Sequence, residues 1–305
     1  MKDIIIIGGG IAGLTAGMYA QRGGMDTLLF EKMFVGGQAA TTYSIENYPG
    51  FVDPISGPDF AMKLESHARK FGLEILYDEV KDIQVDGKIK KVITDNKEYQ
   101  TKTIILAMGA SPKMLGLEKE EQFRGRGVSY CATCDGAFYK DKVTAVVGGG
   151  DTATEDAMFL AQYASKVYLI HRRDQLRASK ILQDRVMAHP RIEILWDTVV
   201  ESIMGEEQVE GIKVRNLKTD SLSQLELDGF FIAIGIQPNS GLIAGKVDMT
   251  DDGFVLTDEN MATNVPGVFA VGDLRYKPVW QLVTAASDGA IGTLSAQRYI
   301  MENFE

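Results

Sequence analysis

Cys131 and Cys134, the only two cysteines among 305 residues, lie in the stretch SYCATCDG at residues 129–136. Two cysteines cannot build a disulfide framework, and a lone C-x-x-C pair in a cytosolic chain is more often catalytic or metal-binding. Structural zinc would need two further ligands, and the three histidines are all distant in sequence. A redox pair is therefore favoured and no metal site is expected. A chance spacing of two ordinary thiols is the alternative.

The composition is typical of a globular α/β protein with two domains of ordinary size. Apolar residues make up 45% and charged residues 24%, and the 32 glycines exceed the usual share of ~7%. Such an excess indicates tight turns and close approach of the backbone to ligands. The net charge of −10 argues against a nucleic-acid partner. The N-terminus shows no signal-peptide pattern, and no window approaches the ~18 apolar residues of a membrane span. We expect a cytoplasmic protein.

A first dinucleotide motif lies in DIIIIGGGIAGLTAGMYA at residues 3–20, which predicts a buried strand, a glycine turn and a helix. The spacing Gly8-x-Gly10-x-x-Gly13 allows the turn, the approach of a pyrophosphate and close helix packing, in that order. The helix N-terminus offers free N–H groups to phosphates. The next strand ends at Glu31, whose carboxylate can accept hydrogen bonds from ribose hydroxyls. This motif suits FAD or NAD.

The pattern recurs at residues 141–157, DKVTAVVGGGDTATEDA, with Gly148, Gly150 and Ala153 at the three positions. Both Glu31 and His171 lie 23 residues after the first glycine of their motif. In the second motif His171, Arg172 and Arg173 therefore replace the acid, and guanidinium groups bind a 2′-phosphate bidentately. The second motif suits NADP. The alternative is that Arg172, Arg173 and Arg177 form a solvated basic edge.

Two such motifs imply two nucleotides and electron transfer between them. Each unit is expected to close with a further strand, at 103–112 and at 228–239. The segment TNVPGVFAVGD, residues 263–273, places Asp273 at the carboxyl end of a strand, where doubly wound sheets hold ligands. The helix predicted over 283–300 could direct its positive end at a flavin and stabilise the charge of the reduced ring. The alternative for Asp273 is an acid in a surface turn.

Seven segments together resemble the low-molecular-weight, bacterial-type thioredoxin reductases, which are FAD-dependent pyridine nucleotide-disulfide oxidoreductases. The resemblance covers essentially the whole chain in the expected order. The segments are GGGIAGLTA (8–16), GGQ (36–38), IENYPGF (45–51), GVSYCATCDGAF (127–138), GGGDTA (148–153), HRRDQLRAS (171–179) and TNVPGVFAVGD (263–273).

The resemblance implies an α/β fold with two Rossmann-like dinucleotide-binding domains, in which the NADPH domain is inserted into the FAD domain. The FAD domain would comprise residues 1–114 and 243–305, and the NADPH domain, which carries the C-x-x-C pair, residues 115–242. The implied protein is a homodimeric enzyme that passes electrons from NADPH through FAD and the cysteine pair to thioredoxin.

The same resemblance implies the binding residues. Those expected to contact FAD are Gly8, Gly10, Ala12, Gly13, Glu31, Lys32, Gly37, Gln38, Asn47, Ala107, Gly109, Gly272, Asp273 and Gln281. Those expected to contact NADPH are Gly148, Gly150, Asp151, Thr152, Ala153, His171, Arg172, Arg173 and Arg177.

In this family the thiol at the position of Cys134 faces the flavin, and the one at the position of Cys131 attacks the partner's disulfide. The nucleophile is the thiolate. Asp135 resembles the acid that protonates the leaving thiolate, which a carboxyl group can do if burial raises its pKa. The alternative for Asp135 is a helix N-cap or first-turn acid, and both roles are compatible.

The chain departs from the family pattern at Trp280, Met108 and Ser287. The usual Arg-Gln pair reads Trp280-Gln281, so a guanidinium is lost beside the flavin. Trp280 either stacks on an aromatic ring or is a partly exposed interface residue. Alternative functions are a related flavoenzyme that uses ferredoxin as donor or another disulfide as substrate, and a non-catalytic flavin redox sensor.

The position of the cysteines predicts motion. Cys134 lies 14 residues before Gly148, so the disulfide belongs to the domain that holds NADPH. The nicotinamide and Cys134 must both touch the flavin, and one rigid body cannot present both at once. We expect the middle domain to swing on two hinges, near residues 112–116 and 240–246.

Overall fold

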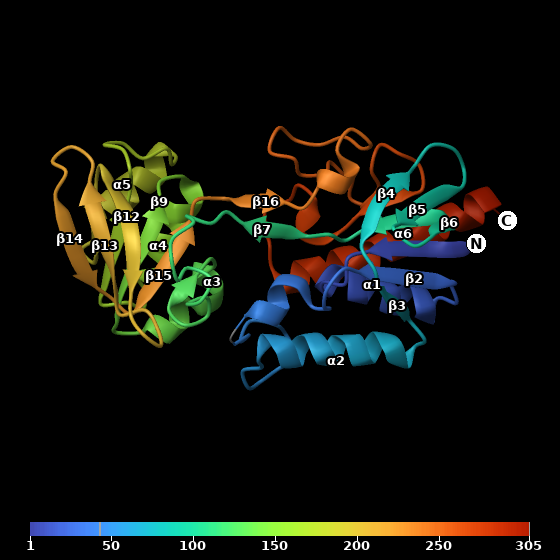
Figure 1. Ribbon diagram of the computed structural model, residues 1–305, viewed down its shortest axis with the longest axis horizontal. Helices are drawn as coiled ribbons and strands as arrows, with labels where there is room; N and C mark the ends of the chain where they lie inside the picture. The colour runs from blue at the N-terminus through green and yellow to red at the C-terminus, as the bar shows by residue number, and fades with distance from the viewer. Residues whose placement is uncertain (43, 305) are drawn as a thin grey trace. The chain divides into compact units, whose positions relative to one another are not determined.

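The computed structural model describes residues 1–42 and 44–304. The chain forms two compact units: the first comprises Met1–Ser111 and Gln237–Glu305, and the second Pro112–Ile236. The predicted borders were 114/115 and 242/243, a few residues from those of the two units. The chain passes between the units through β7 (Ala110–Pro112) and β16 (Ile236–Pro238), which pair as a two-stranded sheet (Figure 1).

The first unit is built on a seven-stranded sheet of order β3-β2-β1-β6-β5-β4, with β17 also paired to β6. The pairs among β1, β2, β3, β6 and β17 are parallel, and β4 and β5 add an antiparallel edge. The strands are β1 (Lys2–Ile7), β2 (Thr27–Glu31), β3 (Glu74–Tyr77), β4 (Val80–Gln84), β5 (Lys90–Thr94), β6 (Glu98–Leu106) and β17 (Val268–Ala270). The helices are α1 (Ile11–Arg22), α2 (Gly57–Lys70) and α6 (Leu282–Phe304), with short 3₁₀ turns η1 (Gly37–Thr41), η3 (Gly241–Ile243) and η4 (Gly272–Leu274).

The run of four isoleucines in β1 explains why this strand lies at the centre of the sheet. Ile4 and Ile6 point into the cluster formed with α1, α2 and α6, while Ile5 and Ile7 point into the cluster on the opposite face. A parallel strand covered on both faces is typically apolar throughout rather than alternating. Helix α6 packs closely on α1, because Gly289 brings the two backbones together: a Cβ at Gly289 would lie 2.3 Å from the carbonyl oxygen of Ala12.

The second unit repeats the arrangement in a parallel sheet of order β11-β10-β9-β15-β8, beside an antiparallel sheet β12-β13-β14. Its parallel strands are β8 (Val128–Ser129), β9 (Val143–Gly148), β10 (Lys166–Ile170), β11 (Ile192–Leu195) and β15 (Gly229–Ala233). The antiparallel strands are β12 (Thr198–Met204), β13 (Gly211–Asn216) and β14 (Leu222–Glu226). The helices are α3 (Ala132–Asp135), α4 (Asp151–Leu160) and α5 (Lys180–Ala188), and the 3₁₀ turn η2 (Gly136–Tyr139) follows α3.

Each unit therefore contains a central parallel strand, a glycine turn and a helix, as the two sequence motifs predicted. The predicted fold class, α/β with two Rossmann-like units, is confirmed. No helix in the described part of the chain has the length and apolar character needed to cross a membrane.

Candidate functional site

The two cysteines form a disulfide in the second unit, between the end of β8 and the start of η2. Cys131 and Cys134 are bonded, with their Cα atoms 5.3 Å apart. Cys131 is the N-cap residue of the one-turn helix α3, and Cys134 lies within it. Among the described residues no group of three or more His, Cys, Asp or Glu side chains could hold a metal ion. The pair is thus built as a disulfide on a short helical turn.

Asp135 lies beside this disulfide in a hydrogen-bonded turn with Ser129. The Ser129 hydroxyl donates to Oδ2 of Asp135 at 2.6 Å, and the backbone N–H of Cys131 donates to Ser129 Oγ at 3.1 Å. Burial raises the pKa of Asp135, and the hydrogen bond from Ser129 opposes that rise. Cys131 is the N-cap residue of α3, and Asp135 is the acid of its first turn and the N-cap residue of η2, where its side chain makes no capping hydrogen bond. The alternative structural role of Asp135 as a first-turn acid is therefore compatible with this geometry. Its carboxyl group faces the strand that precedes the disulfide.

The glycine turn of the first unit has the shape that a bound pyrophosphate requires. Gly8 has a φ of +106°, and a Cβ there would lie 2.5 Å from the carbonyl oxygen of Ala107; at Gly13 it would lie 1.9 Å from the carbonyl oxygen of Gly8. At Gly10, in contrast, an added Cβ would meet no atom within 4 Å. Two glycines are therefore fixed by packing, and the middle one borders open space where a ligand can approach.

Side chains and loops predicted to bind FAD gather at this turn. Oε2 of Glu31 accepts from the N–H of Gly9 at 2.8 Å, and Oε1 accepts from the N–H of Met33 at 3.0 Å. Gly36 donates to the carbonyl oxygen of Gly9 at 2.8 Å, and a Cβ on Gly37 would lie 3.4 Å from Cα of Gly10. Glu31 and Gly37 therefore lie at the turn, and Lys32 and Gln38 follow them on the surface.

A second group of predicted FAD residues comes from distant parts of the chain. The amide of Asn47 donates to Oε1 of Gln281 at 3.0 Å across 234 residues. A Cβ on Gly272 would lie 2.8 Å from Cβ of Ala12, so the Gly272–Asp273 turn rests on the start of α1. The fold thereby places η4 and the first turns of α6 next to the N-terminal end of α1. Ala107 and Gly109 follow the end of β6, and Gly109 has a φ of +65°.

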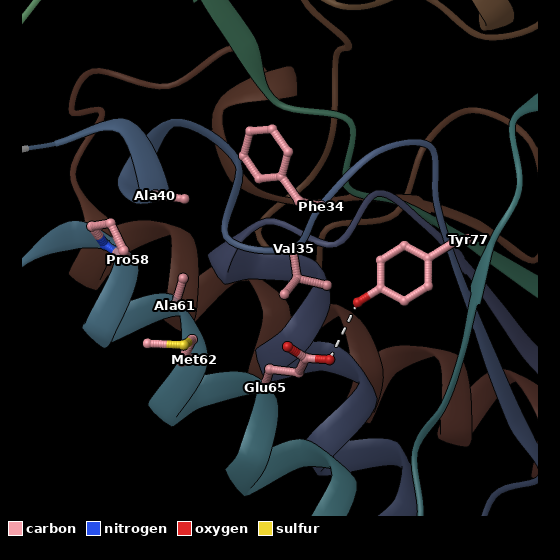
Figure 2. Close-up of a pocket in the computed structure, with 8 residues that line it drawn as sticks. All are labelled: Phe34, Val35, Ala40, Pro58, Ala61, Met62, Glu65 and Tyr77. Carbon is pink, nitrogen blue, oxygen red and sulfur yellow. Dashed lines mark hydrogen bonds between the residues drawn. The ribbon is translucent and has the colours of Figure 1, made fainter.

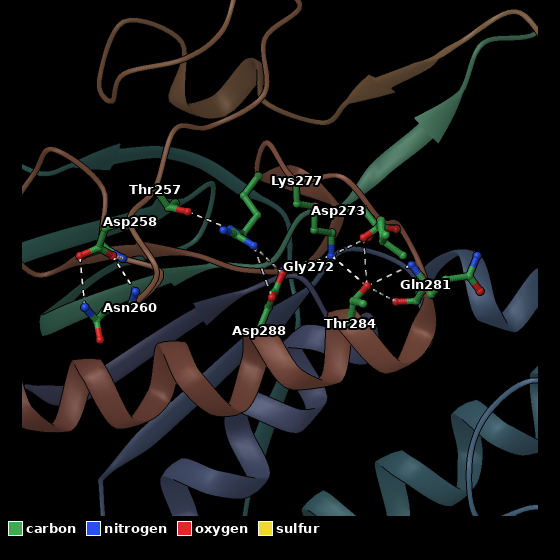
Figure 3. A network of polar contacts seen from close by, with 12 residues as sticks. Thr257, Asp258, Asn260, Gly272, Asp273, Lys277, Gln281, Thr284 and Asp288 are labelled. Atoms are coloured by element: carbon green, nitrogen blue, oxygen red, sulfur yellow. Dashed lines mark hydrogen bonds and ion pairs between the residues drawn. The ribbon is translucent and has the colours of Figure 1, made fainter. Parts of the chain in front are cut away.

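Figure 3 shows the polar groups around that turn. Nζ of Lys277 lies 3.2 Å from Oδ1 of Asp273 and 3.2 Å from Oδ2 of Asp288. Burial raises the pKa of Asp273, and Lys277 opposes the rise. The Lys277 ammonium group is the partner of Oδ1 of Asp273, and the Asp273 side chain is 33% exposed. Asp273 therefore takes part in an ion-pair cluster at this turn.

The glycine turn of the second unit follows the same plan. At Gly148 a Cβ would lie 2.4 Å from the carbonyl oxygen of Ala233 and 2.5 Å from Cβ of Ala153, whereas at Gly150 it would meet no atom within 4 Å. Oδ1 of Asp151 accepts from the N–H of Ser179 at 2.6 Å. Ala153 is buried and Thr152 is exposed. This turn, too, borders open space at its middle glycine.

His171 is buried, whereas the arginines that follow it are exposed. The imidazole is buried, with Nδ1 3.0 Å from the carbonyl oxygen of Gly148 and Nε2 3.0 Å from that of Gln175. Burial lowers its pKa, and Arg177 and Arg173 lower it further. Arg172, Arg173 and Arg177 are exposed. The imidazole thus joins the glycine turn to the loop that carries the arginines, and the three guanidinium groups remain open to an anion.

Trp280 packs against Phe254, with ring centroids 5.7 Å apart and an angle of 38° between the rings. The residue is half-buried, and its indole Nε1 is buried without a hydrogen-bond partner among the described residues. Trp280 thus contacts an aromatic ring in a tilted arrangement, and its half-buried position is also compatible with the interpretation as a partly exposed interface residue.

Three residues of these sites, Ser129, Lys277 and Asp288, were not predicted from the sequence. Ser129 lies two residues before Cys131, so proximity to the motif was the available signal. Lys277 lies four residues after Asp273, so its spacing was the available signal, whereas Asp288 is brought to Lys277 by the packing of α6.

A pocket of about 310 Å³ lies in the first unit beside the loop that carries Gly37 and Gln38 (Figure 2). Its lining is mainly apolar, and at one end the Tyr77 hydroxyl donates to Oε1 of Glu65 at 3.3 Å. None of the predicted site residues lines it. The lining residues are Phe34, Val35, Ala40, Pro58, Ala61, Met62, Glu65 and Tyr77.

Two units with dinucleotide-type glycine turns, one of which carries a disulfide next to a half-buried carboxyl group, define a nucleotide-dependent disulfide oxidoreductase. The model of the family described as "Pyridine nucleotide-disulphide oxidoreductase" matches residues 2–290. The chain belongs to this family.

The chain is 44% identical over 309 residues to a protein of Peptoclostridium acidaminophilum named thioredoxin reductase, covering 99% of this chain and 98% of that protein. It is 45% identical over 302 residues to a protein of Listeria monocytogenes with the same name, covering 98% and 94%. The crystal structure of thioredoxin reductase from Streptococcus pyogenes superposes with a TM-score of 0.95 at 44% identity, covering 99% of each chain.

Proposed function

We propose that this protein is a thioredoxin reductase, an enzyme that transfers electrons from NADPH, through FAD and the Cys131–Cys134 disulfide, to the disulfide of thioredoxin. The observation that carries the proposal is the Cys131–Cys134 disulfide itself, built beside Asp135 in a chain with two nucleotide turns. The names of relatives that match this chain over nearly its full length support thioredoxin as the substrate.

The first unit is assigned to FAD. The open space at Gly10 and the carboxylate groups of Glu31 and Asp273 fit a dinucleotide with free hydroxyl groups. FAD, when bound, accepts two electrons from a pyridine nucleotide and passes them to a disulfide. The further residues assigned to it are Gly8, Ala12, Gly13, Lys32, Gly37, Gln38, Asn47, Ala107, Gly109, Gly272 and Gln281.

The second unit is assigned to NADPH. Its glycine turn leaves open space at Gly150, and Arg172, Arg173 and Arg177 present exposed guanidinium groups on the loop after β10. Such groups bind a 2′-phosphate in charge-assisted hydrogen bonds. We assign His171 to positioning rather than to direct contact, because both of its ring nitrogens already face backbone carbonyl oxygens. Gly148, Asp151, Thr152 and Ala153 complete the turn.

In the redox centre, Cys134 is assigned as the thiol that exchanges electrons with the flavin and Cys131 as the thiol that attacks thioredoxin. When the S–S bond accepts two electrons, one proton is needed to convert one of the two thiolates to a thiol. Asp135, with its pKa raised by burial, is the group that holds this proton. Ser129 orients the carboxyl group through its hydroxyl. We further propose that the enzyme is a cytoplasmic homodimer.

Rapid mixing of the FAD-loaded protein with NADPH in the absence of oxygen tests the proposal against its alternatives. We expect loss of the yellow flavin absorbance with NADPH and much slower loss with NADH, followed by recovery on addition of oxidised thioredoxin. Loss of the flavin absorbance with reduced ferredoxin but not with NADPH would favour ferredoxin as the electron donor. Bleaching by NADPH without recovery on thioredoxin would favour another disulfide substrate, and no bleaching would favour a non-catalytic sensor.

A further inference from the structure

A buried lysine lies at the centre of the cluster drawn in Figure 3. The side chain of Lys277 is only 4% exposed, and that of Asp288, on α6, only 8%. The Lys277 ammonium group lies 3.2 Å from one carboxylate oxygen of Asp288 and 3.2 Å from one of Asp273. Two carboxylates therefore share one ammonium group in the interior of the first unit.

The charges in this cluster balance, but packing does not explain their presence. Nη1 of Arg275 lies 3.5 Å from Asp288, and its Nε donates to Oγ1 of Thr257 at 2.8 Å. Two cations and two carboxylates make the cluster neutral. Removal of ions from water is costly, and apolar residues often stabilise a buried position equally well. A purely structural contact between η4 and α6 would not need four charged groups.

The geometry links Lys277 to the turn that carries Asp273. The N–H of Gly272 donates to Oδ2 of Asp288 at 3.2 Å, the same oxygen that contacts Lys277. Asp288 therefore holds both the turn and the lysine. Oδ1 of Asp273 contacts the same ammonium group, while the Asp273 side chain stays 33% exposed. An ionised carboxylate has about four lone-pair sites, so Asp273 can pair with Lys277 and still accept a hydrogen bond from another donor.

We propose that Lys277 is a positioning residue for FAD: anchored by Asp288, its ammonium group orients the Asp273 carboxylate as an acceptor for the cofactor. This inference rests on the assignment of FAD to the first unit. Lys277 acts through Asp273 and is not itself a catalytic residue. The competing explanation is that Lys277 only neutralises Asp288 and stabilises the packing of α6.

A double-mutant cycle on FAD affinity separates the two explanations. The dissociation constant of FAD for the apoprotein is measured by quenching of flavin fluorescence in the wild type, Lys277→Met, Asp273→Asn and the double variant. The thermal midpoint of each apoprotein is recorded in parallel. Lys91→Met serves as the control, because Lys91 pairs with Glu98 on the surface of the same unit. Lys277→Gln repeats the cycle with a polar side chain, should the methionine variant fail to fold.

We expect Lys277→Met to weaken FAD binding about tenfold or more, as the loss of a hydrogen bond to a charged group does. The loss of FAD affinity caused by Lys277→Met should be far smaller in the Asp273→Asn background. Lys277→Arg should retain most of the affinity for FAD. An equal loss of affinity in both backgrounds, or an unchanged affinity in Lys277→Met, overturns the proposal. If the wild type bound FAD but could not reduce thioredoxin, the proposed function would be refuted. The double-mutant cycle would still test the role of Lys277, because it measures only FAD affinity.

Discussion

Asp135 is subject to two opposing effects, and their balance determines how it handles a proton. Burial raises the pKa of its carboxyl group, and the hydrogen bond donated by Ser129 lowers it. A carboxyl group with a raised pKa can hold a proton closer to neutral pH, which protonation of a thiolate requires. The position beside Cys134 pointed to Asp135 in the sequence. The contact with Ser129 depends on the turn between β8 and α3, so the sequence alone did not reveal it.

Asp135→Asn should slow reoxidation of the reduced flavin by the disulfide and leave reduction by NADPH nearly unchanged. In the wild type the reoxidation rate should fall as the pH rises through the pKa of Asp135, because the acid form is lost. Ser129→Ala removes the hydrogen bond that lowers this pKa, so the fall should move to higher pH. Stopped-flow measurement of both half-reactions across pH checks this. Equal slowing of both half-reactions by Asp135→Asn would indicate a structural role.

Residue spacing predicted the position of His171 along the chain but not the environment of its side chain. The offset of 23 residues from Gly148 correctly placed it after the strand next to the glycine turn. Spacing could not show that the ring is buried between the carbonyl oxygens of Gly148 and Gln175. That depends on the path of residues 171–177, which fold back so that the N–H of Arg177 donates to Gly149.

The loop after β10 carries the predicted preference for NADPH. Replacement of both Arg172 and Arg173 by alanine should raise the KM for NADPH roughly a hundredfold or more, since each charge-assisted contact contributes about 1.5–3 kcal/mol. The KM for NADH should hardly change, because NADH lacks the 2′-phosphate. Steady-state kinetics with both nucleotides provide the test. A wild type that prefers NADH would show that these arginines form a solvated edge.

The strand, glycine turn and helix at the start of the chain were predictable because each glycine has a local geometric task. An alanine at Gly13 would place its Cβ 1.9 Å from the carbonyl oxygen of Gly8, whereas at Gly10 it would enter open space. Gly10 has φ −70° and ψ −174°, which alanine adopts without strain. Gly13 is therefore needed for the turn to fold, whereas Gly10 is needed only for the ligand to approach the backbone.

Gly13→Ala should destabilise the apoprotein by about 3 kcal/mol or more, as overpacking against backbone does. Gly10→Ala should change apoprotein stability by less than about 1 kcal/mol, while FAD binding weakens because the new methyl group occupies the space that the pyrophosphate needs. Chemical denaturation and FAD titration of the two variants check both effects. Wild-type FAD affinity in the Gly10→Ala protein would show that the pyrophosphate does not bind at this turn.

Contacts between distant segments could not be predicted from the sequence. Asn47 and Gln281 are 234 residues apart, and their hydrogen bond exists because α6 returns to the start of α1. Lys277 and Asp288 are only 11 residues apart, but they belong to the segment before α6 and to α6 itself, and their contact depends on how the chain turns between them. No periodicity or spacing predicts the pair of Asn47 and Gln281. The resemblance to a known family supplied Asn47 and Gln281 as site residues but not Lys277 and Asp288.

The division of the chain into two units has a mechanistic consequence for the whole molecule. The disulfide and the proposed NADPH site both belong to residues 112–236, while the proposed FAD site belongs to the other unit. One rigid body should not present the nicotinamide and Cys134 to the flavin together. Turnover should therefore require rotation about the two connections, β7 and β16.

A short crosslink between the two units should permit one half-reaction and block the other, depending on the orientation that it traps. Stopped-flow traces of flavin reduction by NADPH and of flavin reoxidation by the disulfide would report which one survives. Cleavage of a reversible crosslinker should restore both and serves as the control. Normal turnover in the fully crosslinked protein would refute the rotation.

The central claim is that electrons from NADPH leave this protein only through Cys131 and Cys134. Anaerobic incubation of the FAD-loaded wild type, Cys131→Ser and Cys134→Ser with NADPH and oxidised thioredoxin, followed by a count of thioredoxin thiols, tests it most directly. The wild type should yield two thiols per NADPH consumed. Both variants should yield essentially none, although the flavin of Cys134→Ser is still bleached by NADPH. Reduction of thioredoxin at near wild-type rate by either variant would contradict the claim.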